Sequence, residues 1–137
     1  MTRYEQFDCR IDRDDDGQIV RLQVTVNSSD PQRTVMLNGD RAARIAGPLH
    51  DILRSGGVTG RQWSTGRPIA LDQTTGAHAW LLLDATRALR RADRLDEVGE
   101  GIARMSREEA SYWYAKSRQP RGLRAARLLL SDDARRR

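Results

Sequence analysis

Cysteine and lysine are almost missing from this chain. Its 137 residues include one cysteine, Cys9, and one lysine, Lys116, against 23 arginines. A single cysteine excludes an internal disulfide and a zinc site built on cysteine pairs. The excess of arginine over lysine indicates a GC-rich coding bias. With a single lysine, the acid–acid–lysine arrangement of many metal-dependent nucleases is hard to build.

Long apolar runs are missing as well. No stretch approaches the roughly 18 apolar residues of a membrane span. The polar start, residues 1–6, has no signal-peptide core behind it. We therefore expect a cytoplasmic protein without membrane contact. A chain of this length fits one domain, expected over residues 1–130 and followed by a disordered basic tail at 131–137.

Apolar residues alternate with polar ones in the first third of the chain, which is typical of strands with one wet face. The alternating residues are Phe7, Cys9 and Ile11, then Val20, Leu22, Val24 and Val26. Asp16-Gly17 between the two groups favours a tight turn. With a short third strand at 34–37, the sequence predicts an antiparallel β-meander over residues 4–38.

Helical periodicity follows the meander. A helical segment is expected over 40–55, capped by Asp40 and interrupted at Gly47-Pro48. Residues 58–72 are predicted to be loop, with edge strands around Trp63 and 69–71 as an alternative. Residues 75–130 form an array of short helices, with starts expected at Thr74 or Thr75, at Asp93 and at a capping box over 106–109. The fold class is α+β, an N-terminal meander of about three strands packed on C-terminal helices.

An acidic stretch at 12–17 resembles the first half of a calcium-binding EF-hand loop. Position 12 of that loop should be a bidentate glutamate, and here it is Gln23. The residues that follow have strand period where an EF-hand needs a helix. We therefore predict an acidic hairpin turn, and keep a calcium-responsive module as the minor alternative.

Catalytic motifs are not found. His50 and His78 are the only histidines, and neither lies in a metal-binding or nucleophile-activating pattern. A Gly-x-Ser-x-Gly elbow, a phosphate loop and a Gly-x-Gly-x-x-Gly motif are missing too. We expect no enzyme activity, no catalytic residue, no cofactor and no metal ligand.

Basic and aromatic residues gather near the end of the chain. Residues 61–137 carry a net charge of +6, whereas residues 1–60 carry −1. Three of the seven aromatic residues are consecutive, at 112–114. One interpretation buries Trp113 and Tyr114 against the leucines of 123–130. The other places an exposed ring among basic side chains, which suits stacking on nucleic acid or a protein interface rich in Trp, Tyr and Arg. The candidate binding residues are Tyr112, Trp113, Lys116, Arg118, Arg121, Arg124 and Arg127.

Four stretches of the C-terminal part together resemble a small uncharacterised prokaryotic family, namely 89–94, 101–110, 112–116 and 123–130. Its members are encoded beside multi-gene phage-defence clusters that contain an ATPase, a helicase and a DNA methyltransferase. The resemblance covers residues 75–130 and transfers no site residues. It implies an accessory protein in an antiviral defence system.

The sequence therefore predicts a non-catalytic accessory subunit. It would dock on a larger protein partner through its arginine- and aromatic-rich C-terminal helices. The alternative is a sequence-nonspecific nucleic-acid-binding protein that uses the same basic surface on phosphates.

Overall fold

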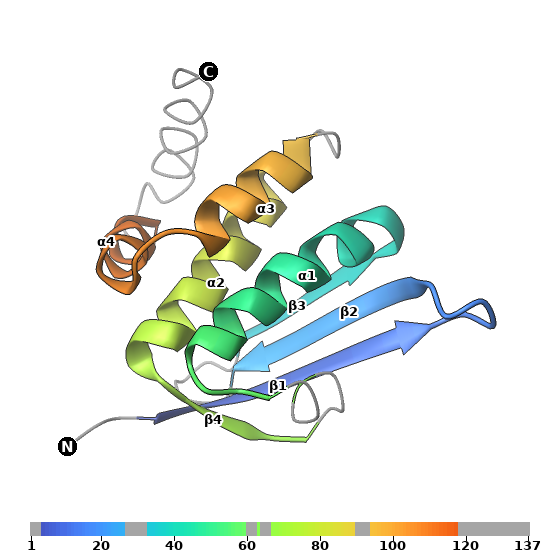
Figure 1. Cartoon of the computed structure of the whole chain (residues 1–137), viewed down its shortest axis with the longest axis horizontal. Coiled ribbons are helices and arrows are strands. Elements are labelled where there is room, and N and C mark those ends of the chain that lie inside the picture. Colours follow the sequence, from blue (N-terminus) through green and yellow to red (C-terminus); the bar gives the residue numbers. More distant parts are fainter. Residues whose placement is uncertain (1–3, 27–32, 60–62, 64–66, 90–93, 118–137) are drawn as a thin grey trace.

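The computed structural model describes residues 4–26, 33–59, 63, 67–89 and 94–117, and within them the chain forms four strands and four helices (Figure 1). The strands are β1 (Tyr4–Arg13), β2 (Ile19–Val26), β3 (Arg33–Asn38) and β4 (Ile69–Asp72). The helices are α1 (Gly39–Ser55), α2 (Gln73–Ala88), α3 (Leu95–Ala103) and α4 (Arg107–Ser117). The expected α+β fold is confirmed. The tail at 131–137 lies outside the described residues.

The four strands form one antiparallel sheet in the order β3-β2-β1-β4. Its first three strands are the expected meander, and β4 adds a fourth along β1. The alternative of an edge strand around 69–71 is the one the structure shows, so the expected loop is wrong for Ile69–Asp72. Only Ile69 and Leu71 alternate with polar or small neighbours there, which is too short a pattern to decide between strand and loop.

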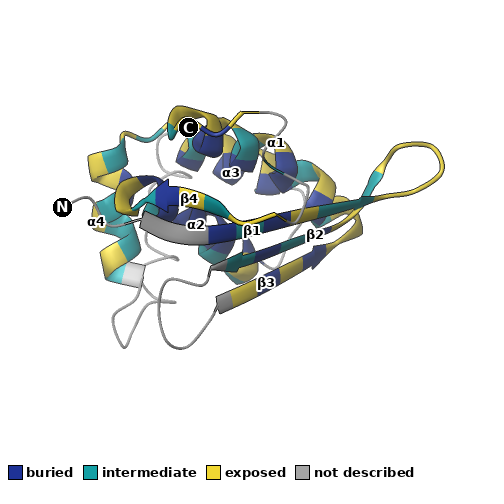
Figure 2. Cartoon of the chain, turned by 90° about the horizontal axis from the view of Figure 1, so that it is seen from below, coloured by how far each residue is buried: buried dark blue, intermediate teal, exposed yellow. Residues whose placement is uncertain are grey.

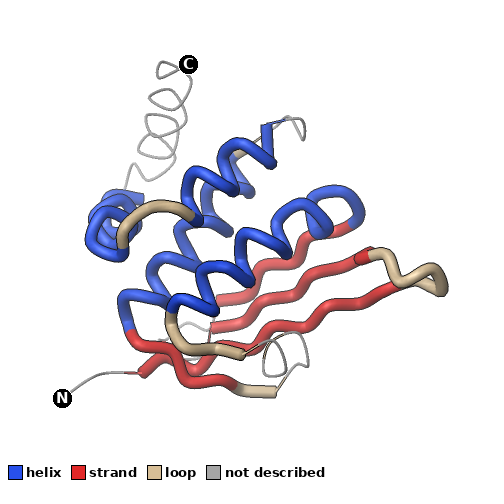
Figure 3. Tube along the Cα trace, in the orientation of Figure 1, coloured by secondary structure: helices blue, strands red, loops and turns tan. Residues whose placement is uncertain are grey.

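The helices gather on one face of the sheet (Figure 3). α1 and α2 contact the strands, α3 packs on α1 and α2, and α4 packs on α2. The strand residues that face the helices are buried, namely Phe7, Cys9, Leu22, Val24, Val35, Leu37 and Leu71. Their neighbours along each strand, such as Arg10, Arg21 and Met36, are exposed and lie on the other face, because successive strand residues point to opposite faces. Figure 2 shows buried and exposed residues alternating along β3.

The acidic stretch between β1 and β2 is a hairpin turn, as predicted. The Asp14 N–H donates to the Gln18 carbonyl at 2.9 Å, and the Gly17 N–H donates to the Asp14 carbonyl at 3.0 Å. Gly17 has a φ of 80°, a conformation that favours glycine. One carboxylate oxygen of Asp14 accepts from the N–H groups of Asp16 and Gln18, both at 2.9 Å. That carboxylate therefore closes its own turn.

α1 differs from the sequence expectation at two places. It runs unbroken through Pro48, so the interruption predicted at Gly47-Pro48 is wrong. A Cβ built on Gly99 of α3 would lie 3.3 Å from Pro48 Cγ, so the ring packs closely on α3. We infer that this packing offsets the missing hydrogen bond. The predicted cap is also wrong, because Asn38 is the N-cap and Asp40 lies in the first turn.

α1 ends in a Schellman motif, in which two backbone bonds satisfy the last carbonyl groups. The Val58 N–H donates to the Leu53 carbonyl and the Gly57 N–H to the Arg54 carbonyl, both at 3.0 Å. Gly57 has a φ of 90°, and Val58 and Leu53 are both buried in the core. The helix stop expected at Ser55-Gly56-Gly57 is confirmed.

The later helices begin close to the predicted residues. Asp72 is the N-cap of α2 and accepts from the Thr75 N–H at 2.7 Å, so this helix starts slightly before Thr74. Ser106 Oγ accepts from the Glu109 N–H at 3.1 Å, which confirms the serine half of the capping box. α3 follows Arg94, and Asp93 lies outside the described residues.

Candidate docking site on helix α4

The structure separates the three consecutive aromatic residues of α4. Tyr112 is 56% exposed, whereas Trp113 and Tyr114 are half-buried and pack against the hydrophobic core. Neighbouring helix residues point about 100° apart, so burial of the second and third rings turns the first outward. The burial interpretation concerned only Trp113 and Tyr114, so the exposure of Tyr112 does not contradict it. The leucines of 123–130, proposed as their cover, lie outside the described residues.

The exposed ring of Tyr112 has two neighbours on its own helix. Trp113 meets it edge-on, with the ring centroids 5.4 Å apart at 80°. The Nζ of Lys116 lies 5.5 Å from the Tyr112 centroid, within the range of a cation–π contact. Such contacts are worth about 0.5–1 kcal/mol at exposed sites. The ring is therefore held in a defined position with a positive charge above it.

Two acidic residues flank the same ring. Glu108 and Glu109 are exposed and lie one helical turn before Tyr112, at the spacings where side chains share a face. We call Glu108, Glu109, Tyr112, Trp113 and Lys116 the α4 patch. It combines an apolar centre with charges of both signs, two acidic and one basic.

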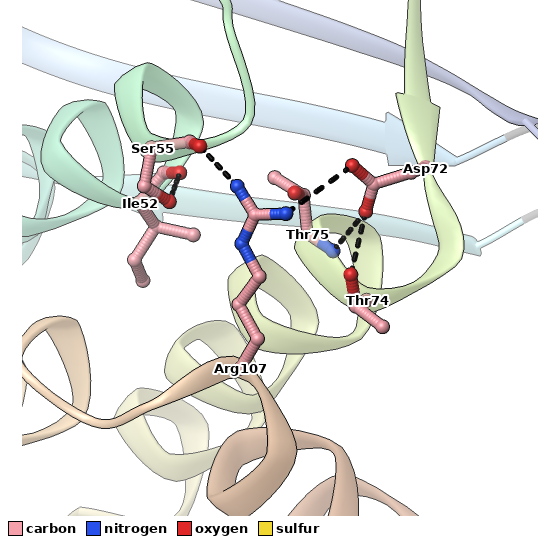
Figure 4. Close-up of polar contacts among 6 residues, drawn as sticks. All are labelled: Ile52, Ser55, Asp72, Thr74, Thr75 and Arg107. Carbon is pink, nitrogen blue, oxygen red and sulfur yellow. Dashed lines mark hydrogen bonds and ion pairs between the residues drawn. The ribbon is translucent and has the colours of Figure 1, made fainter.

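Arg107, the first residue of α4, links this helix to two other elements (Figure 4). Its guanidinium donates to the backbone carbonyl of Ser55, at the C-terminal end of α1. The same group lies 3.8 Å from a carboxylate oxygen of Asp72, at the start of α2. Together with Ala110, which is fully buried, Arg107 fixes the N-terminal end of α4.

Asp72 combines the cap of α2 with the ion pair to Arg107. One carboxylate oxygen accepts from the Thr75 N–H and from the Thr74 hydroxyl, each at 2.7 Å. Burial on its own would raise the pKa of Asp72. The hydrogen bonds from Thr75 and Thr74 and the nearby charge of Arg107 outweigh this effect, and the pKa lies below its usual value.

Replacing Asp72 with alanine is expected to lower the free energy of unfolding by about 1 kcal/mol, the usual cost of a lost N-cap. Asp72→Asn is the matched control, because asparagine caps a helix equally well and lacks the charge. Since the pKa of Asp72 is depressed on folding, its contribution is present above about pH 4 and is lost as the pH falls further. Urea unfolding at neutral pH checks the prediction, and equal losses in both variants would contradict the capping role.

His78 lies inside the protein, between α2 and α3. It is 3% exposed, and its Nε2 lies 2.5 Å from the backbone carbonyl oxygen of Ile102. A carbonyl can only accept, so Nε2 carries the proton and Nδ1 has none. Nδ1 is buried without a hydrogen-bond partner. Burial lowers the pKa of His78, the bond to Ile102 opposes this, and the positive charge of Arg107 lowers it further.

His50 is engaged in a different way. Its ring stacks on Trp63, with centroids 4.5 Å apart and planes inclined by 6°. Both histidines thus make packing or backbone contacts, and the Nε2 of His50, like the Nδ1 of His78, is buried without a hydrogen-bond partner. In the described part of the chain, no group of three or more His, Cys, Asp or Glu side chains is placed to hold a metal ion.

A family model for a domain of unknown function, DUF7680, matches residues 6–132. The chain belongs to the DUF7680 family. No curated protein and no solved structure matches it significantly. In this DUF7680 chain, none of the described helices combines the length and the apolar character needed to cross a bilayer.

The DUF7680 fold brings three of the seven predicted binding residues together, namely Tyr112, Trp113 and Lys116. The other four, Arg118, Arg121, Arg124 and Arg127, lie outside the described residues. Sequence reasoning missed Arg107 and Asp72, which anchor the helix. The capping box at Ser106 marked where α4 begins. No local pattern could indicate that the next residue, Arg107, contacts α1 and the end of β4, which lie far away in the sequence.

Proposed function

We propose that this chain is a non-catalytic accessory subunit that docks on a larger protein partner through the α4 patch. The observation that carries the proposal is Tyr112, an aromatic residue 56% exposed on a helix whose first residue is anchored to two other elements. Tyrosine and tryptophan are enriched among the residues that dominate binding energy at protein interfaces. A rigid ring also loses little conformational freedom when a partner covers it.

The charges of the patch favour a protein partner over nucleic acid. A phosphate-binding surface concentrates positive charge, yet Glu108 and Glu109 are exposed one turn from Tyr112. Carboxylates at that position repel phosphates. A protein interface accommodates both signs at its rim. Arg118, Arg121, Arg124 and Arg127 follow α4 in the chain and belong to the proposal by sequence position alone.

The resemblance of residues 75–130 to a family encoded beside phage-defence gene clusters suggests the setting. An accessory subunit of such a system would have large neighbours, including an ATPase, a helicase and a methyltransferase. We extend the proposal to this antiviral role. A small chain that presents an exposed aromatic residue on an anchored helix fits the role of a subunit that binds larger proteins.

Affinity capture from the native cell lysate at moderate salt, with and without nuclease, tests the proposal. The wild-type chain is expected to retain a protein partner after nuclease treatment. Tyr112→Ala is expected to weaken this binding by roughly 30-fold or more, the effect of losing a hot-spot residue of about 2 kcal/mol. Binding constants measured with the purified partner give the size of the loss.

Val20→Ala is the matched control, because Val20 is also an exposed apolar residue, at 41%, and lies on β2 away from α4. It should bind the partner like the wild type. Both variants should keep the wild-type melting temperature, since both side chains are exposed. Release of the partner by nuclease, together with retardation of DNA or RNA in low-salt gels, would favour the nucleic-acid alternative.

A further inference from the structure

Two carboxylates of the α4 patch are left unpaired by the described part of the chain. Glu108 and Glu109 are exposed, and neither side chain makes an ion pair or a hydrogen bond with a described residue. Most other acidic side chains in that part are engaged, and six of them lie beside an arginine, namely Asp12, Asp40, Asp51, Asp72, Asp96 and Glu100. The two glutamates thus stay unpaired in a chain with 23 arginines.

The needs of α4 itself explain only part of this arrangement. Acidic residues in the first turn of a helix interact favourably with its dipole. Glu108 and Glu109 also precede Tyr112 by four and three residues, the spacings at which side chains share a face. Arg107, next to them in the chain, does not neutralise them, because its guanidinium is bound to Ser55 and Asp72 (Figure 4).

The charges around the exposed ring are separated along the helix axis. Both carboxylates lie one turn before Tyr112, whereas Lys116 lies one turn after it, with its Nζ 5.5 Å from the ring centroid. A protein that covers the ring also removes water from the carboxylates beside it. Such desolvation is costly unless the covering surface brings positive groups of its own.

We propose that the protein bound at the α4 patch carries arginine or lysine side chains beside the apolar pocket that receives Tyr112, and that these side chains pair with Glu108 and Glu109. This rests on the docking function proposed above and adds the chemistry of the partner. Arginine suits the position best, because its planar guanidinium can bind a carboxylate through two parallel hydrogen bonds.

The rate of association tests the pairing. The probe is the purified protein that the wild-type chain captures, and the variant is Glu108→Gln combined with Glu109→Gln, which keeps the size of both side chains and removes their charge. At about 50 mM salt, this variant is expected to associate about three- to tenfold more slowly than the wild type. The difference should shrink at about 500 mM salt, where screening is stronger. Surface plasmon resonance at both salt concentrations gives the rates.

Asp15→Asn combined with Asp16→Asn is the matched control. Both carboxylates are exposed, lack an ion pair with any described residue and lie in the hairpin between β1 and β2, far from α4 (Figure 1). This control changes the net charge by the same amount and should associate like the wild type. Equal slowing in both double variants, or no slowing in the glutamate variant, would overturn the proposal. So would a lower melting temperature with unchanged association, which would assign the glutamates to helix stability alone.

Tyr112→Ala distinguishes failure of this proposal from failure of the docking function. If Tyr112→Ala binds like the wild type, the docking function is wrong and the partner chemistry is wrong with it. If Tyr112→Ala weakens binding and the glutamate variant does not, only the partner chemistry is wrong.

Two other occupants of the patch would also overturn the proposal. A dimer mass of the chain alone in sedimentation velocity, reduced to one chain by Tyr112→Ala, would identify a second copy. Tighter binding of DNA or RNA by the glutamate variant, together with release of the partner by nuclease, would identify nucleic acid, since removing carboxylates favours phosphate contact.

Discussion

Replacing Gly56 with alanine is expected to lower the free energy of unfolding by about 1–3 kcal/mol, the usual cost of forcing extra volume into a packed site. A Cβ at this position would lie 2.5 Å from Thr75 Cγ2, 2.6 Å from its Oγ1 and 3.0 Å from its Cβ. Thr75 is 1% exposed and is branched at Cβ, so its side chain has little freedom to move away. Thermal or urea unfolding measures the loss.

The control for Gly56→Ala lies in α1, the helix that Gly56 follows as its C-cap. Gly47 is inside α1, and a Cβ built there meets nothing within 4 Å. Gly47→Ala should therefore cost much less stability than Gly56→Ala, since alanine is the better helix former, although its Cβ would crowd the ring of the following Pro48. A clearly larger loss of stability in Gly56→Ala than in Gly47→Ala would confirm close contact between α1 and α2. A neutral Gly56→Ala would contradict it.

The stability of the protein is expected to fall as the pH drops below about 6.5, the ordinary pKa of histidine. The cause is His78, whose pKa is lowered in the folded protein by its burial. Below that pH the histidine binds a proton in the unfolded chain but not in the folded protein, so acid favours unfolding. A single proton of this kind gives a slope of up to about 1.4 kcal/mol per pH unit.

His78→Gln separates the titration from the packing. The glutamine amide can still donate to the Ile102 carbonyl, but it does not titrate. This variant should unfold with a weaker pH dependence than the wild type between about pH 7 and pH 5. Urea unfolding over that range makes the comparison. A wild-type slope that persists in His78→Gln would assign the acid sensitivity to other groups.

The parts of the fold that sequence reasoning predicted are those with a local physical signal. Alternation over Phe7–Ile11 and Val20–Val26 defined two strands, and Ser55-Gly56-Gly57 defined the end of α1. The interruption at Pro48 was wrong because proline acts locally, whereas the compensating contact with Gly99 comes from a helix about 50 residues later. β4 depended in the same way on pairing with Tyr4–Phe7.

The candidate site was predictable in composition but not in arrangement. The clustering of Tyr112, Trp113 and Lys116 is visible in the sequence. Which ring faces solvent depends on how α4 rotates against α2, and that rotation is set by burial of Ala110 and by the contacts of Arg107. Those contacts join residues 52 and 35 positions apart, beyond the reach of any short motif.

The contacts that attach α4 to the rest of the fold determine how easily this helix unfolds locally. Its packing surface is provided by α2, and Arg107 adds polar contacts to Ser55 and Asp72 at one end. Among the described elements α4 packs mainly on α2, and a helix of this kind can detach while the sheet and α1 stay folded. Amide hydrogens of α4 would then exchange through a smaller opening than those of β2. A partner bound at Tyr112 would close that opening and slow the exchange.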